Sequence, residues 1–325
     1  MALDQSRNPS VDLSIRLHHR RHGEVTDALL SALGARTGGD PLIIPFFGPT
    51  RCGKSQVLRA LSQRHGRVVA GPGNLIAGAD FRVASIPPRP NERDIYKALL
   101  RACDYDCPDR EKTEAVRRRA FGVIRDHGIQ VIALDEVNHL AESGANVPHR
   151  AAADHFKSIA DETGVALILT GLPKFQTVID GNEQFRDRCH ATVYYLPYDW
   201  HEEADRSEFF GAVVTILDRF RDAGIAVEID EFDATRRLYG ASGGRVGMML
   251  WLMSGAAAAL ETGAPLALED IAAAGARMLQ KRGAADFLSG DPPEDRDLFR
   301  AYLDILKEAD LKFLPRGARD LEAML

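Results

Sequence analysis

The sequence has few cysteines, few tryptophans and no net positive charge. The shortage of cysteine and the lack of net positive charge each argue against a class of protein. Its 325 residues include four cysteines and two tryptophans. No two cysteines form a C-x-x-C pair, which argues against a zinc site or a disulfide framework and favours a reducing cytoplasm. Lysine and arginine number 41 against 47 aspartate and glutamate, a net charge of −6, so nucleic-acid binding would need a local basic patch.

Long apolar segments are also absent. The longest uncharged run, 246–260, is shorter than the roughly 20 residues that a membrane span needs, and it is typical of a buried helix. The polar N-terminus has no apolar stretch of the kind found in a signal peptide. We therefore expect a cytoplasmic protein with no membrane partner.

One motif dominates what is present, the eight residues Gly48-Pro49-Thr50-Arg51-Cys52-Gly53-Lys54-Ser55. They match G-x-x-x-x-G-K-[ST], the phosphate-binding P-loop. The motif lies between an apolar strand pattern at 42–47 and a helical pattern at 56–63, which is the context that it needs. The alternative is a glycine turn with a surface lysine.

The P-loop predicts an ATP site with a magnesium ion. Gly48 and Gly53 permit backbone angles that a side chain forbids, so that successive N–H groups can bind phosphate at the helix N-terminus. Lys54 would reach the β- and γ-phosphates, Ser55 would ligate Mg²⁺, and Gln56 ends the nucleotide-binding segment. Pro45 removes a hydrogen-bond donor from the preceding strand, which predicts a local bulge there.

Alternating strand and helix patterns predict an α/β fold with a parallel sheet flanked by helices. After residue 200 only helical patterns occur, which predicts a small all-helical lid domain. The expected strands are 42–47, 67–70, 81–86, 129–134, 165–169 and 191–196. The expected domains are an N-terminal arm and helix (1–40, with a solvated basic cluster at 18–22), a nucleotide-binding domain (41–200), the helical lid (201–285) and a C-terminal helix and tail (286–325).

Polar residues at the ends of two predicted strands supply candidates for catalysis. Asp135 and Glu136 end the apolar run 129–134, where a P-loop ATPase needs one carboxylate for Mg²⁺ and one to orient water. Thr170 ends the next strand, where its hydroxyl could sense the γ-phosphate or cap the following turn.

Three arginines are further candidates. Arg186 and Arg188 precede the last strand, and either could project onto a neighbouring subunit's γ-phosphate or form a surface salt bridge. Arg245 follows Ser242-Gly243-Gly244 and is expected to point from the lid toward the nucleotide, with a solvent-exposed turn as the alternative.

A local excess of basic residues precedes the Asp-Glu strand. It predicts salt-sensitive, sequence-independent contacts with the phosphates of duplex DNA, although a solvated helix face explains the same pattern. The candidates are Lys97, Arg101, Lys112, Arg117, Arg118 and Arg119.

Together these motifs resemble an AAA+ ATPase, and within that class the TniB/TnsC family of transposition ATPases. The resemblance covers roughly 20–260. It rests on Gly-Pro-Thr-Arg-Cys-Gly-Lys-Ser at 48–55, Ile-Pro-Pro-Arg-Pro-Asn-Glu-Arg-Asp-Ile-Tyr-Lys-Ala-Leu-Leu at 86–100, Leu-Asp-Glu-Val-Asn-His-Leu at 134–140, Leu-Thr-Gly-Leu-Pro at 169–173 and Asn-Glu-Gln-Phe-Arg-Asp-Arg-Cys at 182–189.

The resemblance implies an AAA+ P-loop NTPase core that hydrolyses ATP slowly and forms a ring or helical homo-oligomer on duplex target DNA. It also implies two protein partners, a transposase and a TniQ-like target-selection protein. Two other functions remain open at this point. One is a helicase-loader-like ATPase, and the other is a nucleotide-dependent signalling or secretion-accessory switch that does not bind DNA.

Overall fold

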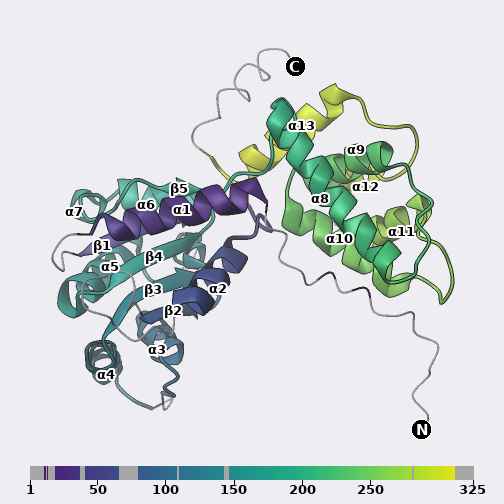
Figure 1. Ribbon diagram of the computed structural model, residues 1–325. Helices are drawn as coiled ribbons and strands as arrows, with labels where there is room; N and C mark the ends of the chain where they lie inside the picture. The colour runs from purple at the N-terminus through teal and green to yellow at the C-terminus, as the bar shows by residue number, and fades with distance from the viewer. Residues whose placement is uncertain are drawn as a thin grey trace, which may run out of the picture. The chain divides into compact units, whose positions relative to one another are not determined.

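The computed structural model describes residues 11, 13, 19–36, 41–65, 80–107, 110–142, 146–279 and 282–311. The strand predicted at 67–70, most of the N-terminal arm and the tail after 311 lie outside these residues. Tertiary contacts divide the chain into two units. The core unit comprises His22–Thr50 and Lys54–Tyr195, and the helical unit comprises Met1–Arg21, Arg51–Gly53 and Leu196–Leu325 (Figure 1).

The core unit is built on a five-stranded parallel sheet in the order β2-β3-β4-β1-β5. Its middle strands are β3 (Ile129–Asp135), β4 (Ala166–Gly171) and β1 (Leu42–Phe47), which are apolar and almost entirely buried. Such strands are typical of a parallel sheet covered on both faces. The flanking strands are β2 (Asp80–Ser85) and the short β5 (Val193–Tyr194). The predicted parallel sheet is therefore confirmed.

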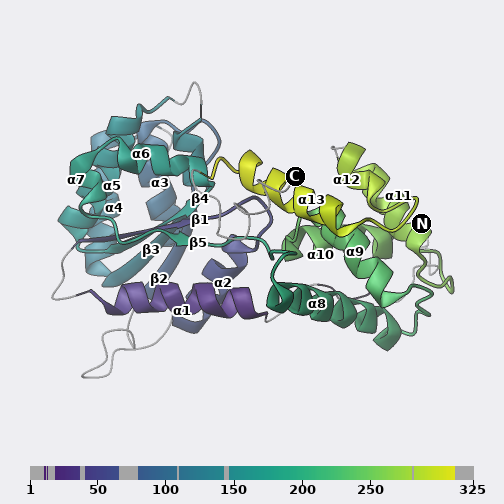
Figure 2. The same ribbon diagram turned by 90° about the horizontal axis from the view of Figure 1, so that it is seen from above.

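Helices cover both faces of this sheet. Figure 2 shows α1 and α2 on one face and α3 to α7 on the other. The elements are α1 (Arg20–Gly34), α2 (Lys54–His65), α3 (Glu92–Ala102), α4 (Thr113–Asp126), η1 (Val137–Leu140), α5 (His149–Thr163), η2 (Pro173–Phe175), α6 (Gln176–Asp180) and α7 (Glu183–Arg186).

The bulge predicted at Pro45 is wrong. β1 pairs with β4 in continuous register from Leu42 to Phe47. Alternate residues of a parallel strand face the same neighbour, and the Ile43 N–H donates toward the β5 side, to the Arg188 carbonyl at 3.2 Å. Pro45 also faces β5. That strand begins only at Val193, which pairs with Phe46, so Pro45 has no partner residue in β5. The missing donor therefore interrupts no pairing with β4.

The helical unit packs its helices around α9. The elements are α8 (Glu203–Asp222), α9 (Glu231–Ser242), α10 (Val246–Ala259), α11 (Leu268–Met278), α12 (Arg282–Asp286) and α13 (Asp295–Glu308). α9 contacts α8, α10, α12 and α13. Within the described ranges, no helix combines the length and the apolar character needed to cross a membrane.

The basic cluster near the N-terminus is not a solvated arm over its described residues. Arg20 and Arg21 both donate to the carboxylate of Asp205, which is 2% exposed. The ring Nδ1 of His19 lies 2.7 Å from the Tyr198 hydroxyl. This segment therefore packs into the helical unit through charge-assisted hydrogen bonds, which its composition alone did not reveal.

Candidate nucleotide-binding site

Three neighbouring strands bring the predicted catalytic loops to one edge of the sheet. β4 lies between β1 and β3 and is parallel to both. The carboxyl ends of parallel strands meet at one edge, which is where ligands of α/β sheets bind. At this edge β1 leads into Gly48, β3 ends at Asp135, and β4 ends at Thr170 and Gly171.

Lys54 is the first residue of α2 and is held inside the phosphate loop. Its Nζ donates to the carbonyls of Gly48 and Pro49, at 2.8 Å each. The side chain is 9% exposed. The ammonium charge therefore lies at a helix N-terminus, whose unpaired N–H groups add a further attraction for anions.

The two glycines of the loop are needed for different reasons. Gly53 has a φ of +107°, as predicted. Gly48 does not have a positive φ, but a Cβ there would lie 2.2 Å from the Tyr195 carbonyl oxygen. Position 48 therefore requires glycine because the Tyr195 backbone lies too close for a side chain, and not because of its own backbone angles. Arg51 adopts the left-handed region with a φ of +59°, which the sequence did not reveal.

Ser55 and Asp135, the two predicted magnesium ligands, are in direct contact. The Ser55 hydroxyl donates to Asp135 Oδ2 at 2.6 Å. Both supply the oxygen atoms that Mg²⁺ prefers, and this ion usually retains waters and binds substrate phosphates beside one or two protein ligands. No group of three or more metal-binding side chains occurs among the described residues. The donor set therefore fits a nucleotide-associated Mg²⁺.

Glu136 and Thr170 differ in burial. Glu136 is exposed and has a left-handed backbone, with φ 61° and ψ 34°. Thr170 is completely buried, and its hydroxyl has no hydrogen-bond partner among the residues that the structure describes. A buried hydroxyl without a partner costs roughly 1–3 kcal/mol. The Thr170 hydroxyl therefore retains its capacity to bond a ligand or water.

The remaining residues of the predicted segment are divided between surface and interior. Thr50 and Gln56 are exposed, whereas Cys52 is buried.

The two candidate finger arginines have different surroundings. Arg188 pairs with Asp161 through two hydrogen bonds of 3.1 Å and donates to the Gln184 carbonyl at 2.9 Å. Arg186 is exposed, with no ion pair among the described residues. Within one subunit, Arg188 is therefore engaged and Arg186 is available.

Arg245 and Arg51 both belong to the helical unit. Arg245 is 8% exposed and its Nε donates to the Ser242 carbonyl at 2.7 Å. Burial lowers the pKa of Arg245, and the neighbouring Arg51 acts in the same direction. Gly244 has a φ of +76°, and a Cβ there would lie 2.3 Å from the Tyr198 carbonyl oxygen. The predicted close backbone approach at these glycines is confirmed.

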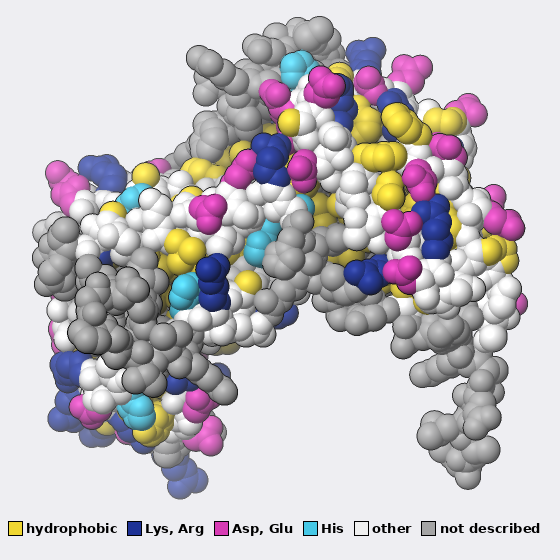
Figure 3. Space-filling model, in the orientation of Figure 1, with side chains coloured by type: hydrophobic (Ala, Val, Ile, Leu, Met, Phe, Trp, Pro, Cys, Tyr) yellow, Lys and Arg dark blue, Asp and Glu magenta, His cyan; other side chains and the backbone are white. Residues whose placement is uncertain are grey.

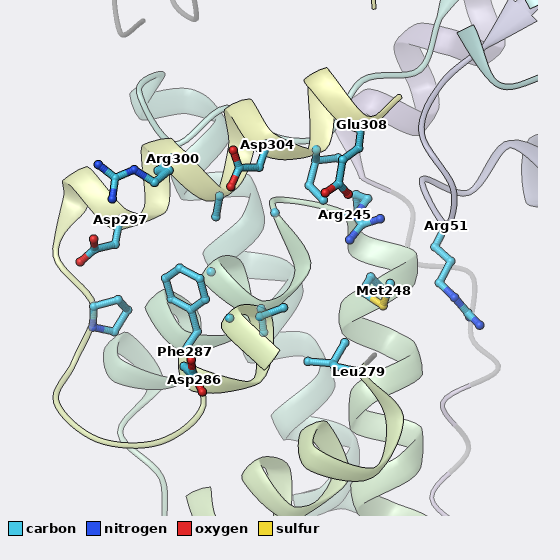
Figure 4. A pocket seen from close by; sticks show the side chains of 18 of the residues that line it. Arg51, Arg245, Met248, Leu279, Asp286, Phe287, Asp297, Arg300, Asp304 and Glu308 are labelled. Atoms are coloured by element: carbon cyan, nitrogen blue, oxygen red, sulfur yellow. The ribbon is translucent and has the colours of Figure 1, made fainter. Parts of the chain in front are cut away.

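Arg51 packs against α10. Its guanidinium lies over the Trp251 ring, 4.1 Å from the centroid. One turn earlier, a Cβ on Gly247 would lie 2.4 Å from the Arg51 carbonyl oxygen. Arg51 and Arg245 also line a cavity of about 940 Å³ in the helical unit, bordered by carboxylates such as Asp304 (Figure 4).

The six candidate DNA-binding residues divide into two groups. Arg117 pairs with Glu162 and Glu114, and Arg119 pairs with Glu111. Arg101, Lys112 and Arg118 are exposed and have no ion pair within the described ranges, and Lys97 is half-buried. Figure 3 shows lysine and arginine side chains gathered at the lower left of this face, over the α4 region, with acidic side chains among them.

One residue of the site was missed. Asn138 is 3% exposed, and its Oδ1 accepts a hydrogen bond from the Leu172 N–H at 3.3 Å, at the end of β4. The sequence signal was an asparagine two residues after Glu136, between the apolar Val137 and a histidine.

Comparison with known proteins shows the family of this chain and its fold. The model for the bacterial TniB protein matches residues 17–196. A search of curated proteins found no match.

Among solved structures, Cdc6p from Pyrobaculum aerophilum is 16% identical with a TM-score of 0.59, over 95% of this chain and 86% of that one. The Aeropyrum pernix ORC1 protein in complex with DNA is 16% identical with a TM-score of 0.57, over 99% and 87%. The ORC2 protein of Aeropyrum pernix, in ADPNP–ADP complexes, is 14% identical with a TM-score of 0.55, over 99% and 81%. At such identities the likeness shows the fold alone, which is the predicted AAA+ P-loop core with a helical domain.

Proposed function

Because the chain belongs to the TniB family, we propose that it is an ATP-dependent, DNA-binding AAA+ regulator of transposition. The ATPase part of the proposal rests on the hydrogen bond between Ser55 and Asp135. This contact lies at the edge of the sheet where Lys54 and Thr170 also lie. These side chains come from three separate loops. Phosphoryl transfer uses a cation, a metal-binding oxygen pair and a water-orienting carboxylate together.

Each residue has a proposed role in ATP hydrolysis. Lys54 exchanges its loop carbonyls for phosphate oxygens, and the loop N–H groups bind the same anion. Glu136 orients the attacking water and withdraws its proton. Thr170 donates its unpartnered hydroxyl to the γ-phosphate or to that water. Mg²⁺, held by Ser55 and Asp135, would neutralise phosphate charge.

Arginines complete the proposed site. Arg245 neutralises nucleotide charge from the helical unit. Arg186 or Arg188 projects from a neighbouring subunit of a homo-oligomer, either a ring or a helical filament. The exposure of Arg186 favours it over Arg188, whose guanidinium is bonded to Asp161.

Duplex DNA is the proposed nucleic-acid partner. Support comes from the family, from the exposed Arg101, Lys112 and Arg118, and from the fold shared with an ORC1 protein that was solved in complex with DNA. The contacts are proposed to be with phosphates. A transposase and a TniQ-like target-selection protein are the proposed protein partners, on the basis of the family resemblance. None of the four cysteines, which all lie within the described residues, forms a disulfide bond, and this is consistent with the proposed cytoplasmic location.

The ATPase proposal is tested by separating nucleotide binding from hydrolysis. Lys54→Ala should weaken binding of a fluorescent ATP analogue by at least about 10-fold, because it removes charge-assisted hydrogen bonds to phosphate. Glu136→Gln should keep the affinity and lower hydrolysis by about 100-fold, because an amide cannot act as a base. Lys307→Ala, at an exposed position on α13, is the matched control and should change neither. Wild-type affinity in Lys54→Ala would show that the site is wrongly assigned.

A further inference from the structure

Gly171, the last residue of β4, is in contact with both neighbouring loops. Its carbonyl accepts a hydrogen bond from the Gly48 N–H of the phosphate loop at 3.3 Å. A Cβ on Gly171 would lie 2.8 Å from Asn138 Oδ1 and 3.1 Å from Asn138 N. The end of β4 therefore fits between the phosphate loop and the turn that follows Asp135 and Glu136, and it fits only as glycine.

Asn138 fastens that turn to β4. It lies in η1, two residues after Glu136, and it is 3% exposed. Its Oδ1 accepts the Leu172 N–H at 3.3 Å. Leu172 is half-buried, and a shielded N–H without a partner is costly, so removal of this oxygen favours separation of η1 from β4.

The backbone of Glu136 needs such support. A residue other than glycine in the left-handed region is strained by about 1–2 kcal/mol. The Glu136 N–H donates to Asp135 Oδ1 at 3.0 Å, which fixes the residue on its β3 side. On the other side, the Glu136 carbonyl accepts from the His139 N–H at 3.2 Å, within η1. The strained conformation therefore persists only while η1 is held in place.

We propose that Asn138 is a positioning residue for ATP hydrolysis, which fixes the Glu136 carboxylate relative to Thr170 and the phosphate loop through Leu172 and Gly171. The inference rests on the proposed ATPase function. Without the Asn138 acceptor, Glu136 relaxes toward an unstrained backbone and its carboxylate moves. Lys54 and Ser55 lie on a different loop, so nucleotide affinity is retained.

The test uses Asn138→Leu, which has a similar size but no acceptor, and Gly171→Ala, whose methyl group meets Asn138. Each should lower kcat by about 10- to 100-fold, because a displaced catalytic group loses its attack geometry. The affinity for an ATP analogue should remain within about threefold. Gly23→Ala is the matched control, since a Cβ there meets nothing within 4 Å.

Three further measurements separate positioning from general damage. Asn138→Asp restores an oxygen acceptor for Leu172 and should recover at least about threefold in kcat over Asn138→Leu. The Asn138→Leu/Gly171→Ala double variant should be no slower than the slower single variant, because both break one contact. Thermal unfolding of the full chain checks that each variant is folded.

The outcomes distinguish this inference from the ATPase proposal. Normal hydrolysis in Asn138→Leu, with hydrolysis lost in Glu136→Gln, would overturn the role of Asn138 alone. A parallel loss of affinity and kcat, additive effects in the double variant, or no recovery in Asn138→Asp would overturn it too. Absence of ATP binding and hydrolysis in the wild type would instead overturn the proposed function.

Discussion

Arg186 and Arg188 are two residues apart, and the sequence could not distinguish them. Both precede the last strand, and both belong to the same motif. The structure separates them because Arg188 points to Asp161 on α5, a contact between residues far apart in the chain. At the residue scale, partner choice of this kind depends on tertiary packing, which no local pattern encodes.

Alanine substitution should separate the two arginines experimentally. Arg188→Ala should lower the free energy of unfolding by about 1 kcal/mol, because it removes a bidentate but partly exposed ion pair. Arg186→Ala should leave the unfolding free energy unchanged and lower hydrolysis by the assembled protein by at least about 100-fold. Denaturant titration and ATPase assays over a range of protein concentrations measure both effects. Full activity in the double variant would rule out the pair as the finger.

Arg51 offers a second test at this scale, because stacking and backbone strain act on the same residue. Arg51→Ala loses the Trp251 contact, worth roughly 0.5–1 kcal/mol, and keeps a side chain at positive φ. Arg51→Gly loses the same contact but relieves the strain. Thermal unfolding should therefore show the alanine variant to be the less stable of the two by about 1 kcal/mol. The reverse order would contradict the strain at this position.

At the scale of elements, the sequence predicted what local patterns determine. Buried strands appear as apolar runs, and Asn91 caps α3 through its side chain, which accepts from the Asp94 N–H at 3.1 Å. The P-loop and the Asp-Glu strand end were located for the same reason. The short α12 and the true extent of β5 were not predicted, because so few residues carry no periodicity. The sheet order and the contact of Asn138 with β4 depend on long-range pairing.

The free energy of unfolding should fall in acid because of a partly buried histidine at the contact between α3 and α5. The hydroxyl of Tyr96 on α3 lies 2.9 Å from His155 Nδ1 on α5, and burial lowers the pKa of His155 from its ordinary value of 6.5. The folded state therefore binds this proton less readily than the unfolded state. The contribution of neutral His155 to the free energy of unfolding is complete above about pH 6.5 and is lost as the pH falls below that value.

Denaturation from pH 7.5 to 5.5 tests this expectation. The wild type should lose more unfolding free energy over that range than His155→Gln, which can still bond Tyr96 but does not titrate. Other groups, including His65, whose pKa is also lowered by burial, act equally in both proteins. Identical pH dependence in the two proteins would show that His155 does not titrate in this window.

For the whole molecule, the net charge of −6 hides a division of basic residues into paired and exposed ones. Arg117 and Arg119 are neutralised by the carboxylates around α4, so the sequence count overstated the charge available to DNA. Arg101, Lys112 and Arg118 remain exposed. Contacts as few as these gain strength when an oligomer repeats them along one duplex.

ATP should therefore be required for binding of duplex DNA, and the exposed residues should matter most. Alanine substitution of Arg101, Lys112 and Arg118 should weaken binding to all duplex sequences alike and reduce the slope of log K against log salt, because phosphate contacts release counterions. Alanine substitution of Arg117 and Arg119 should mainly lower stability, since these side chains hold α4 to its neighbours.

Filter binding at several salt concentrations, with and without ATP, measures these effects. Arg59→Ala/Arg64→Ala on α2 is the matched control, because both residues are exposed and α2 covers the opposite face of the sheet from α4 (Figure 2). A wild-type salt slope in the triple variant would place the DNA surface elsewhere. Absence of ATP-dependent DNA binding in the wild type would favour a nucleotide switch that acts on proteins alone, because the AAA+ core by itself does not require a nucleic-acid partner.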